Sequence, residues 1–147
     1  MGRFELKVDG KGRFSLPSTV KSIFNDSPFV VTNSQHQGHR FLDIYLESEW
    51  KCLEARVQKM SSLNRQVQAF QRFYMAGGQK MQSDSQGRCL VPRSLREYAQ
   101  IHGEVILVGM GNKFELWQMD VWKSVFENLA SGFEETLESI AALDMGA

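Results

Sequence analysis

An internal duplication constrains the fold of this chain of 147 residues more than any other feature. The segment VDGKGRFSLP, residues 8–17, places a charged turn with two glycines between apolar strand-forming residues, and SDSQGRCLVP, residues 83–92, repeats the pattern 75 positions later. The residues that recur are Asp9, Gly12, Arg13 and Pro17, as Asp84, Gly87, Arg88 and Pro92. Because a fixed repeat in sequence corresponds to a repeated structural unit, we expect two copies of one unit.

The same elements are predicted in both copies. Alternating apolar residues predict a short strand on each side of the charged turn, most simply joined as a hairpin. The proline that follows suits the first turn of a short amphipathic helix. Two more strands are then predicted in each copy, at Phe29–Thr32 and Phe41–Leu46 and at Val105–Val108 and Lys113–Trp117.

Helices are predicted after each copy, because the apolar period changes from two to about 3.6 residues. Helical spacing covers residues 50–60, 67–74, 122–129 and 133–143, with Gly132 between the last two. The predicted organisation is a first repeat at 3–50, a helical connector at 51–76, a second repeat at 79–122 and C-terminal helices at 123–147.

Each copy alone is too small to bury a core and would expose unpaired strand edges. The predicted fold class is therefore α+β and rich in β structure. Two tandem half-domains fold against each other as one pseudo-twofold, β-barrel-like unit, and each is followed by helices. Such a unit places equivalent features side by side, so we expect the two charged turns on a common surface.

Charge is balanced overall but not along the chain. Seventeen Lys and Arg offset seventeen Asp and Glu, so composition alone does not indicate a nucleic-acid binder. Residues 1–24 hold five bases and two acids, whereas residues 124–147 hold five acids and no base. For the acidic tail, two interpretations are open: a solvated helix face, or a helix that contacts a partner or another copy.

No secretion, membrane or redox function is predicted. Cys52 and Cys89 do not form a C-x-x-C pair, and the start of the chain lacks the basic and apolar regions of a signal peptide. We expect reduced thiols that act as small packing residues in a cytosolic protein. No apolar segment approaches the roughly 20 residues of a membrane span, so no membrane partner is expected.

No enzyme activity, cofactor or metal is predicted. The sequence shows no nucleophile with an acid–base partner, and GKGR lacks the spacing and the Ser or Thr of a phosphate-binding P-loop. His36 and His39 have a spacing that a metal ion could use, but no Cys or acidic residue stands nearby in sequence, so a solvated loop is predicted. Trp50, Trp117 and Trp122 lie on apolar faces and are predicted to pack in the core.

The charged turn has a structural and a functional interpretation. Turn chemistry explains the Asp, which accepts hydrogen bonds from backbone N–H groups ahead of it, and explains Gly12 and Gly87, which supply positive φ. It does not explain why Arg13 recurs as Arg88, nor why Lys11 stands beside the first arginine. A planar cation with five donors suits phosphate or the edge of guanine, so the arginines are candidate DNA contacts.

These motifs resemble the MraZ family, which is built of two SpoVT/AbrB-type swapped-hairpin repeats with an Asp-x-x-x-Arg signature in each. DGKGRFSLP and DSQGRCLVP are similar to the two signatures, and LREYA at 95–99 and NKFELW at 112–117 are also similar to that family. The resemblance implies a ring-shaped homo-oligomer and a cytosolic, nucleoid-associated transcriptional regulator. It implies a repressor that binds G-rich direct repeats in double-stranded DNA upstream of the bacterial division and cell-wall gene cluster, including its own promoter.

The predicted DNA-binding residues are Arg13, Lys11, Arg88, Lys7 and Arg3, and the predicted loop-shaping residues are Asp9, Gly12, Asp84 and Gly87. The second signature has Gln86 in place of Lys11, so the first turn is predicted to be the primary contact. The alternative function is a non-enzymatic protein-interaction or assembly module that binds acidic partners. A toxin-neutralising antitoxin with the same hairpin fold is a third option, against which the duplication and the helices argue.

Overall fold

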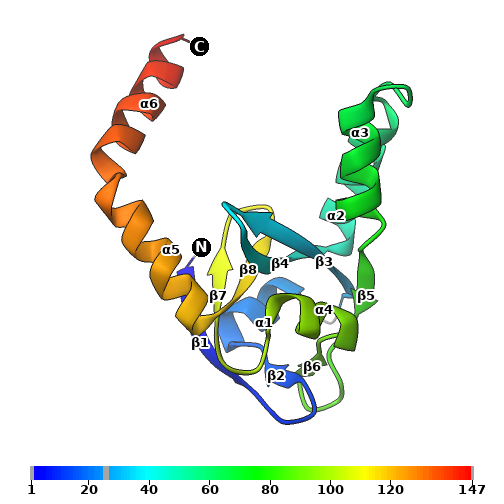
Figure 1. The fold of residues 1–147 in the computed structure, drawn as a ribbon. Coiled ribbons are helices and arrows are strands. Elements are labelled where there is room, and N and C mark those ends of the chain that lie inside the picture. Colours follow the sequence, from blue (N-terminus) through cyan, green and yellow to red (C-terminus); the bar gives the residue numbers. More distant parts are fainter. Residues whose placement is uncertain (1, 25–26, 147) are drawn as a thin grey trace.

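The strands of both copies form one sheet and one ribbon. The computed structural model describes residues 2–24 and 27–146. The sheet strands are β1 (Gly2–Val8), β3 (Phe29–His36), β4 (His39–Leu46), β5 (Gln79–Met81), β7 (Gly103–Gly109) and β8 (Phe114–Gln118), and the ribbon strands are β2 (Arg13–Ser15) and β6 (Arg88–Leu90). The sheet has the order β1-β7-β8-β4-β3-β5, and β2 pairs with β6 in the separate ribbon (Figure 1). All of these pairings are antiparallel.

The strands on either side of each charged turn pair with the other copy. In the first copy β1 pairs with β7 of the second, with Phe4 opposite Leu107, and β5 of the second copy pairs with β3 of the first. At the centre of the sheet Asp43 of β4 lies opposite Glu115 of β8, its counterpart in the duplication. The simple hairpin predicted around each turn is therefore wrong, because the strands before and after the turn belong to different sheets.

The prediction of an α+β fold rich in β structure is confirmed. Within residues 2–24 and 27–146, however, the strands form no closed barrel, since β1 and β5 are the two edges of the sheet and do not pair with each other. The barrel-like unit was expected because small half-domains need to cover their edges. In the structure, β1 of the first copy pairs with β7 of the second, and β5 of the second copy pairs with β3 of the first, so the copies share one sheet that stays open.

The helices are α1 (Ser18–Phe24), α2 (Glu47–Gln58), α3 (Arg65–Phe70), α4 (Arg93–Ala99), α5 (Met119–Ser131) and α6 (Phe133–Gly146), with one turn of π-helix, η1 (Gln71–Met75), after α3. Asn64 caps α3, since its side chain accepts hydrogen bonds from the backbone N–H groups of Gln66 and Val67. As predicted, a break at Gly132 separates α5 from α6. Among the described residues, no helix has the length and apolar character needed to cross a bilayer.

The main core lies between the sheet, the ribbon, α1 and α4. Phe14 and Cys89, which are counterparts in the duplication, pair directly on the ribbon and are 2% and 0% exposed. Trp50 and Trp117 are buried as predicted, in two smaller clusters that attach α2 and α5 to the sheet. Cys52 is exposed, so its prediction as a packing residue is wrong: it lies on the outer face of α2, between Lys51 and Leu53.

The histidines are strand residues. His36 ends β3, His39 begins β4, and the two pair across a turn of Gln37 and Gly38, whose φ values are 50° and 81°. A two-residue turn with both φ values positive matches the twist of its flanking strands and so extends the hairpin to its tip. The prediction of a loop around the histidines is therefore wrong.

Two helical arms rise from the sheet on the side away from the ribbon (Figure 1). The first arm is α2, α3 and η1, and the second arm is α5 and α6. The first arm is fastened to β3, where the Thr32 hydroxyl donates to the carbonyl of Tyr74 at 2.6 Å and the Asn33 amide donates to the carbonyl of Phe73 at 2.9 Å.

A buried polar cluster joins the first arm to the centre of the sheet. The carboxylate of Asp43 accepts hydrogen bonds from the Tyr74 hydroxyl and from Nζ of Lys113, the latter at 2.9 Å. Burial raises the pKa of Tyr74, and the charge of Asp43 raises it further. Burial alone would lower the pKa of Lys113, but the charge and hydrogen bond of Asp43 raise it above its ordinary value. The lysine therefore stays charged and balances the buried carboxylate.

Candidate nucleic-acid interface

The carboxylate of Asp9 organises the first charged turn. Its Oδ1 accepts hydrogen bonds from the backbone N–H groups of Lys11 and Arg13, both at 2.9 Å, and its Oδ2 accepts one from Nε of Arg13 at 2.9 Å. The backbone N–H of Asp9 donates to the carbonyl of Arg13 at 2.8 Å and closes the turn. Gly12 has a φ of 89°, which glycine adopts far more readily than other residues. The backbone bond from Arg13 contributes most to lowering the pKa of Asp9.

The second turn repeats this arrangement. Oδ1 of Asp84 accepts hydrogen bonds from the backbone N–H groups of Gln86 and Arg88 at 2.9 Å, and Oδ2 accepts one from Nε of Arg88 at 3.1 Å. Gly87 has a φ of 76°, and the bond from the N–H of Asp84 to the carbonyl of Arg88 is again 2.8 Å long. The pKa of Asp84 is lowered, mainly by the backbone bond from Arg88. The second turn therefore has the same pattern of hydrogen bonds and the same positive φ at its glycine as the first.

The ribbon places both arginines on one face. Arg13 lies opposite Leu90, and Ser15 lies opposite Arg88. Because side chains alternate along a strand, these four residues share one face of the ribbon, while the residues between them point into the core. Diagonal neighbours on such a ladder are roughly 8 Å apart. The two arginines therefore lie close together on a common surface, as the duplication predicted.

Each arginine is bound to its aspartate through Nε, and its other N–H donors are not used in that contact. The Asp9 contact uses Nε of Arg13, and the Asp84 contact uses Nε of Arg88. A guanidinium group has five N–H donors, so four remain on the two Nη atoms of each arginine. The side chains of Arg13 and Arg88 are 29% and 34% exposed, which leaves both within reach of a ligand on the ribbon face.

Two further cations, which were not among the predicted contacts, lie over the turns. A Cβ atom on Gly12 would lie 2.4 Å from the guanidinium group of Arg96 in α4, and one on Gly87 would lie 2.8 Å from Nζ of Lys21 in α1. Nε of Arg96 also donates to the carbonyl of Val91 at 2.9 Å. Lys21 and Arg96 are separated by the same 75 positions as the two turns, so extending that register into the helices would have identified them.

Of the other predicted contacts, Lys11 lies with the arginines and Lys7 does not. Lys11 is exposed in the first turn, two residues before Arg13. Lys7 is exposed on β1, where it lies opposite Glu104 of β7. An acidic neighbour offsets the positive potential of Lys7, so its surroundings favour a phosphate less than those of Lys11 do.

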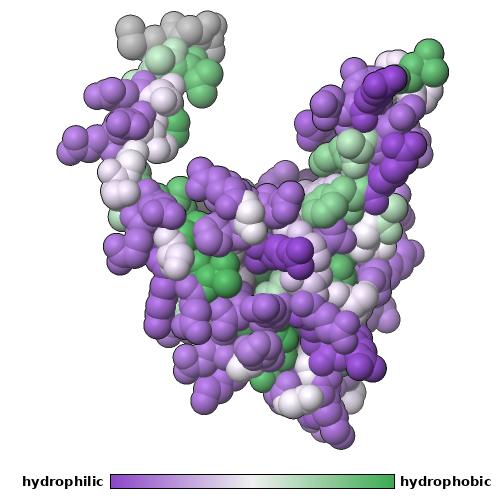
Figure 2. All heavy atoms as spheres, viewed as in Figure 1, coloured by the Kyte–Doolittle hydropathy of each residue, from purple (hydrophilic) through white to green (hydrophobic). Residues whose placement is uncertain are grey.

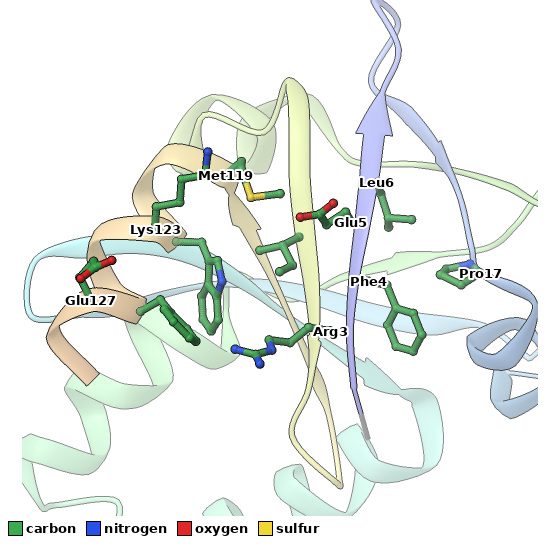
Figure 3. Close-up of a pocket in the computed structure, with 11 residues that line it drawn as sticks. Arg3, Phe4, Glu5, Leu6, Pro17, Met119, Lys123 and Glu127 are labelled. Carbon is green, nitrogen blue, oxygen red and sulfur yellow. The ribbon is translucent and has the colours of Figure 1, made fainter. Parts of the chain in front are cut away.

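Arg3 lies in a groove between β1 and α5, toward the far end of β1 from the first turn (Figure 3). The groove has a volume of about 910 Å³. The guanidinium group of Arg3 lies over the ring of Phe126, 5.0 Å from its centroid, and the acidic residues Glu5 and Glu127 line the same groove. The structure thus brings Arg13, Lys11 and Arg88 together and places Arg3 elsewhere.

Comparisons with known proteins agree with the resemblance of the two turn motifs to the MraZ family. The family model described as "MraZ protein, putative antitoxin-like" matches residues 1–73 and 74–142, one match for each copy. A protein of Thermoanaerobacter pseudethanolicus named transcriptional regulator MraZ is 34% identical over 145 residues, 99% of each chain. Proteins with the same name from Ligilactobacillus salivarius and Carboxydothermus hydrogenoformans are 32% identical over 145 residues, 99% of each chain, and 30% identical over 140 residues, 95% of each chain. The resemblance is thereby confirmed, and this chain belongs to the MraZ family.

Proposed function

We propose that this protein is a DNA-binding transcriptional regulator that contacts double-stranded DNA through the β2–β6 ribbon. The observation that carries the proposal is the pair of arginines, Arg13 and Arg88, each oriented by an aspartate and both on one face of the ribbon. The names of the relatives, which are transcriptional regulators rather than enzymes, support the same class of function.

The dimensions and donors of the ribbon suit the major groove. That groove admits a two-stranded β-ribbon, and its most common specific contact is an arginine bound through two hydrogen bonds to O6 and N7 of guanine. The Nη donors of Arg13 and Arg88 are available for such contacts. Lys11, Lys21 and Arg96 add positive charge around the turns and are suited to neighbouring phosphates, which position a protein without reading sequence.

Membership of the MraZ family supports a more specific role. We propose that the protein is a repressor that acts at G-rich direct repeats upstream of the division and cell-wall gene cluster, including its own promoter, and that it is cytoplasmic and nucleoid-associated. We also propose that the chain is one pseudo-twofold unit of two swapped hairpins, with repeats at 3–50 and 79–122, a helical connector at 51–76 and C-terminal helices at 123–147. The exchange of β1 and β5 between copies supports that organisation.

Selection from a pool of random duplexes with the purified protein tests this function. We expect enrichment of short G-rich motifs in tandem, and tight binding of the selected duplex against an excess of random competitor. Binding to all duplexes alike, with a steep salt dependence, would indicate only the electrostatic attraction that any basic surface has for DNA. Retention of acidic proteins with no preference among duplexes would favour the alternative assembly module.

We propose that several subunits in a ring-shaped homo-oligomer engage successive direct repeats. One ribbon spans only a few base pairs, so tight binding is expected to depend on the high effective concentration of linked sites. A gel-shift titration should give weak binding to one repeat and at least tenfold tighter binding to three or four. Equal affinity for one repeat and for the array would contradict this arrangement.

A further inference from the structure

The outer face of the ribbon carries a large apolar side chain beside its two arginines. Leu90 is 53% exposed and lies directly opposite Arg13 in the pairing of β2 with β6. Its neighbours in sequence, Cys89 and Val91, are both 0% exposed. Because successive side chains of a strand point to opposite faces, these two buried residues direct Leu90 outward. The ribbon therefore presents a leucine on the face that is proposed to contact DNA.

Leu90 and Arg13 are close neighbours across the ribbon. The backbone N–H of Val91 donates to the carbonyl of Gly12 at 3.1 Å. In an antiparallel ladder, pairs that exchange backbone hydrogen bonds alternate with pairs that do not, so the next pair, Arg13 and Leu90, does not. The Cα atoms of such a pair are only about 4.5 Å apart, and their side chains approach most closely. The arginine and the leucine thus extend side by side from one point of the ribbon.

The duplication has a different residue at the corresponding position of the first copy. Ser15 stands 75 positions before Leu90, is also exposed, and lies opposite Arg88. The cross-strand neighbour is therefore a leucine for Arg13 and a serine for Arg88. The strand itself does not require a leucine, because serine occupies the equivalent place in the same ribbon. The leucine thus distinguishes two half-sites whose turns have the same geometry.

The surroundings of Leu90 are polar and positively charged. Lys11 is exposed in the first turn, and the guanidinium group of Arg96 lies over Gly12. Figure 2 shows mainly hydrophilic residues over the end of the molecule that carries the ribbon, with a small hydrophobic area among them. These cations favour DNA over an apolar protein surface as the partner of Leu90, because unpaired charges are costly to bury against hydrocarbon. In the major groove, the apolar group at a base edge is the C5-methyl group of thymine.

We propose that Leu90 recognises a thymine by packing on its C5-methyl group, beside the guanine that Arg13 binds. The inference rests on the proposed contact of the ribbon with DNA and goes beyond it by naming a second specificity-determining residue and its base. Arg13 selects guanine through hydrogen bonds to O6 and N7, whereas Leu90 selects thymine through an apolar contact that cytosine lacks. Ser15 hydrogen-bonds to several base edges, so the half of the ribbon with Arg88 tolerates more sequences.

The spacing of the two residues fixes the spacing of the two bases. The Cα atoms of Arg13 and Leu90 are about 4.5 Å apart, and successive nucleotides of one strand rise by about 3.4 Å. The thymine therefore lies one base step from the guanine, in the same or the opposite strand.

Replacement of thymine by deoxyuridine tests this contact, because it removes the C5-methyl group and leaves the hydrogen-bonding edge of the base unchanged. A single copy of the duplex selected by the wild type is prepared with deoxyuridine at each thymine in turn and titrated by fluorescence anisotropy. Binding should weaken roughly fourfold at the thymine beside the guanine, which corresponds to about 0.8 kcal/mol for one buried carbon group. Deoxyuridine at the other positions should have no effect.

Exchange of the two counterpart residues assigns the methyl effect to Leu90. Leu90→Ser should bind the thymine and deoxyuridine duplexes equally and keep its preference for guanine, and Ser15→Leu should gain sensitivity to deoxyuridine at a second position. Ile23→Ala is a matched control, because Ile23 is also 53% exposed but lies on α1 and lines a pocket with Phe114. It should respond to deoxyuridine as the wild type does. Circular dichroism checks that each variant is folded.

The outcomes separate this inference from the proposed function. A wild type that prefers its selected duplex but tolerates deoxyuridine at every position would overturn the inference and leave the function intact. A selected motif without thymine beside guanine, or a folded Leu90→Ser protein that keeps the wild-type sensitivity, would do the same. A smaller mass of Leu90→Ser in gel filtration, with no methyl effect in the wild type, would assign Leu90 to a contact between copies instead. If no duplex is preferred, the proposed function fails and the inference fails with it.

Discussion

Comparison of the two charged turns separates residues that build the turn from residues that face a ligand. Asp9 and Asp84 each hold two backbone N–H groups and one arginine Nε, at 2.9 Å in the first turn and at 2.9 to 3.1 Å in the second. The turn glycines have positive φ in both. The two turns therefore have the same backbone conformation, and the recurring Asp, Gly and Arg residues explain it.

The turns differ in the cations around them. Lys11 stands in the first turn where the second has the neutral Gln86. Arg96, fixed by Val91, covers the first turn, whereas the more flexible Lys21 covers the second. The first turn thus has the higher and better ordered positive charge, so we propose it as the primary DNA contact.

The largest expected effect concerns the two arginines. Arg13→Ala should weaken binding to one selected duplex by roughly one to two powers of ten, because a bidentate contact to guanine contributes about 1 to 3 kcal/mol of discrimination. Arg88→Ala should have a smaller effect, since the second turn lacks Lys11. Fluorescence anisotropy at fixed salt measures both. A folded, assembled Arg13→Ala protein with unchanged binding, or a consistently larger effect of Arg88→Ala, would reverse the ranking.

The turn glycines are expected to differ in stability effect. Alanine at a positive φ costs roughly 1 to 2 kcal/mol, so Gly12→Ala and Gly87→Ala should both lower the free energy of unfolding. The cost should be larger at Gly12, where the new Cβ meets a guanidinium group that is already bound to a carbonyl, than at Gly87, where it meets the end of a lysine. Urea unfolding followed by circular dichroism measures the difference. Equal costs would show that Arg96 moves aside as freely as Lys21.

Exchange of the neighbouring residues tests the electrostatic difference. Lys11→Gln should reduce the slope of log affinity against log salt by about 0.9 if Lys11 neutralises one phosphate, and should weaken binding to all duplexes alike. Gln86→Lys should restore a similar slope in the same chain if the second turn also reaches a phosphate. Anisotropy titrations over a range of salt measure both slopes. A loss of sequence preference in Lys11→Gln would mean that this lysine reads a base.

The smallest expected difference is in the titration of the two aspartates. Their backbone hydrogen bonds favour the ionised form, so both should titrate below the ordinary value of 3.8. Because the pKa is lower in the folded protein, this contribution to stability is present above 3.8 and is lost as pH falls through the folded pKa. Carbon-detected NMR of the carboxyl groups measures each pKa. A value at or above 3.8 for either would show that its turn is open in solution.

The structure of the two turns was predictable from the pattern of residues, whereas the pairing of strands between the two copies was not. The register of Asp9 with Asp84 predicted both turns, both arginines and their common surface, since turn chemistry is local. Apolar periodicity did not predict the exchange of β1 and β5 between copies, because alternation within a strand does not identify its partner, and only the resemblance to swapped-hairpin repeats implied it. The position of Arg3 was also not predictable. Because it is one of several bases near the N-terminus, Arg3 was grouped with the first turn, but it lies near the start of β1 and contacts Phe126 instead.

The most direct test of the central claim removes both arginines of the ribbon. The Arg13→Ala/Arg88→Ala protein is compared with a Lys51→Ala/Lys123→Ala protein, which loses the same charge from exposed sites away from the turns. Both are titrated with the duplex selected by the wild type and with a random duplex. We expect the arginine variant to bind the two duplexes alike while it remains folded and assembled, and the lysine variant to keep the wild-type preference. Retained preference in the arginine variant would contradict the claim that the ribbon reads DNA.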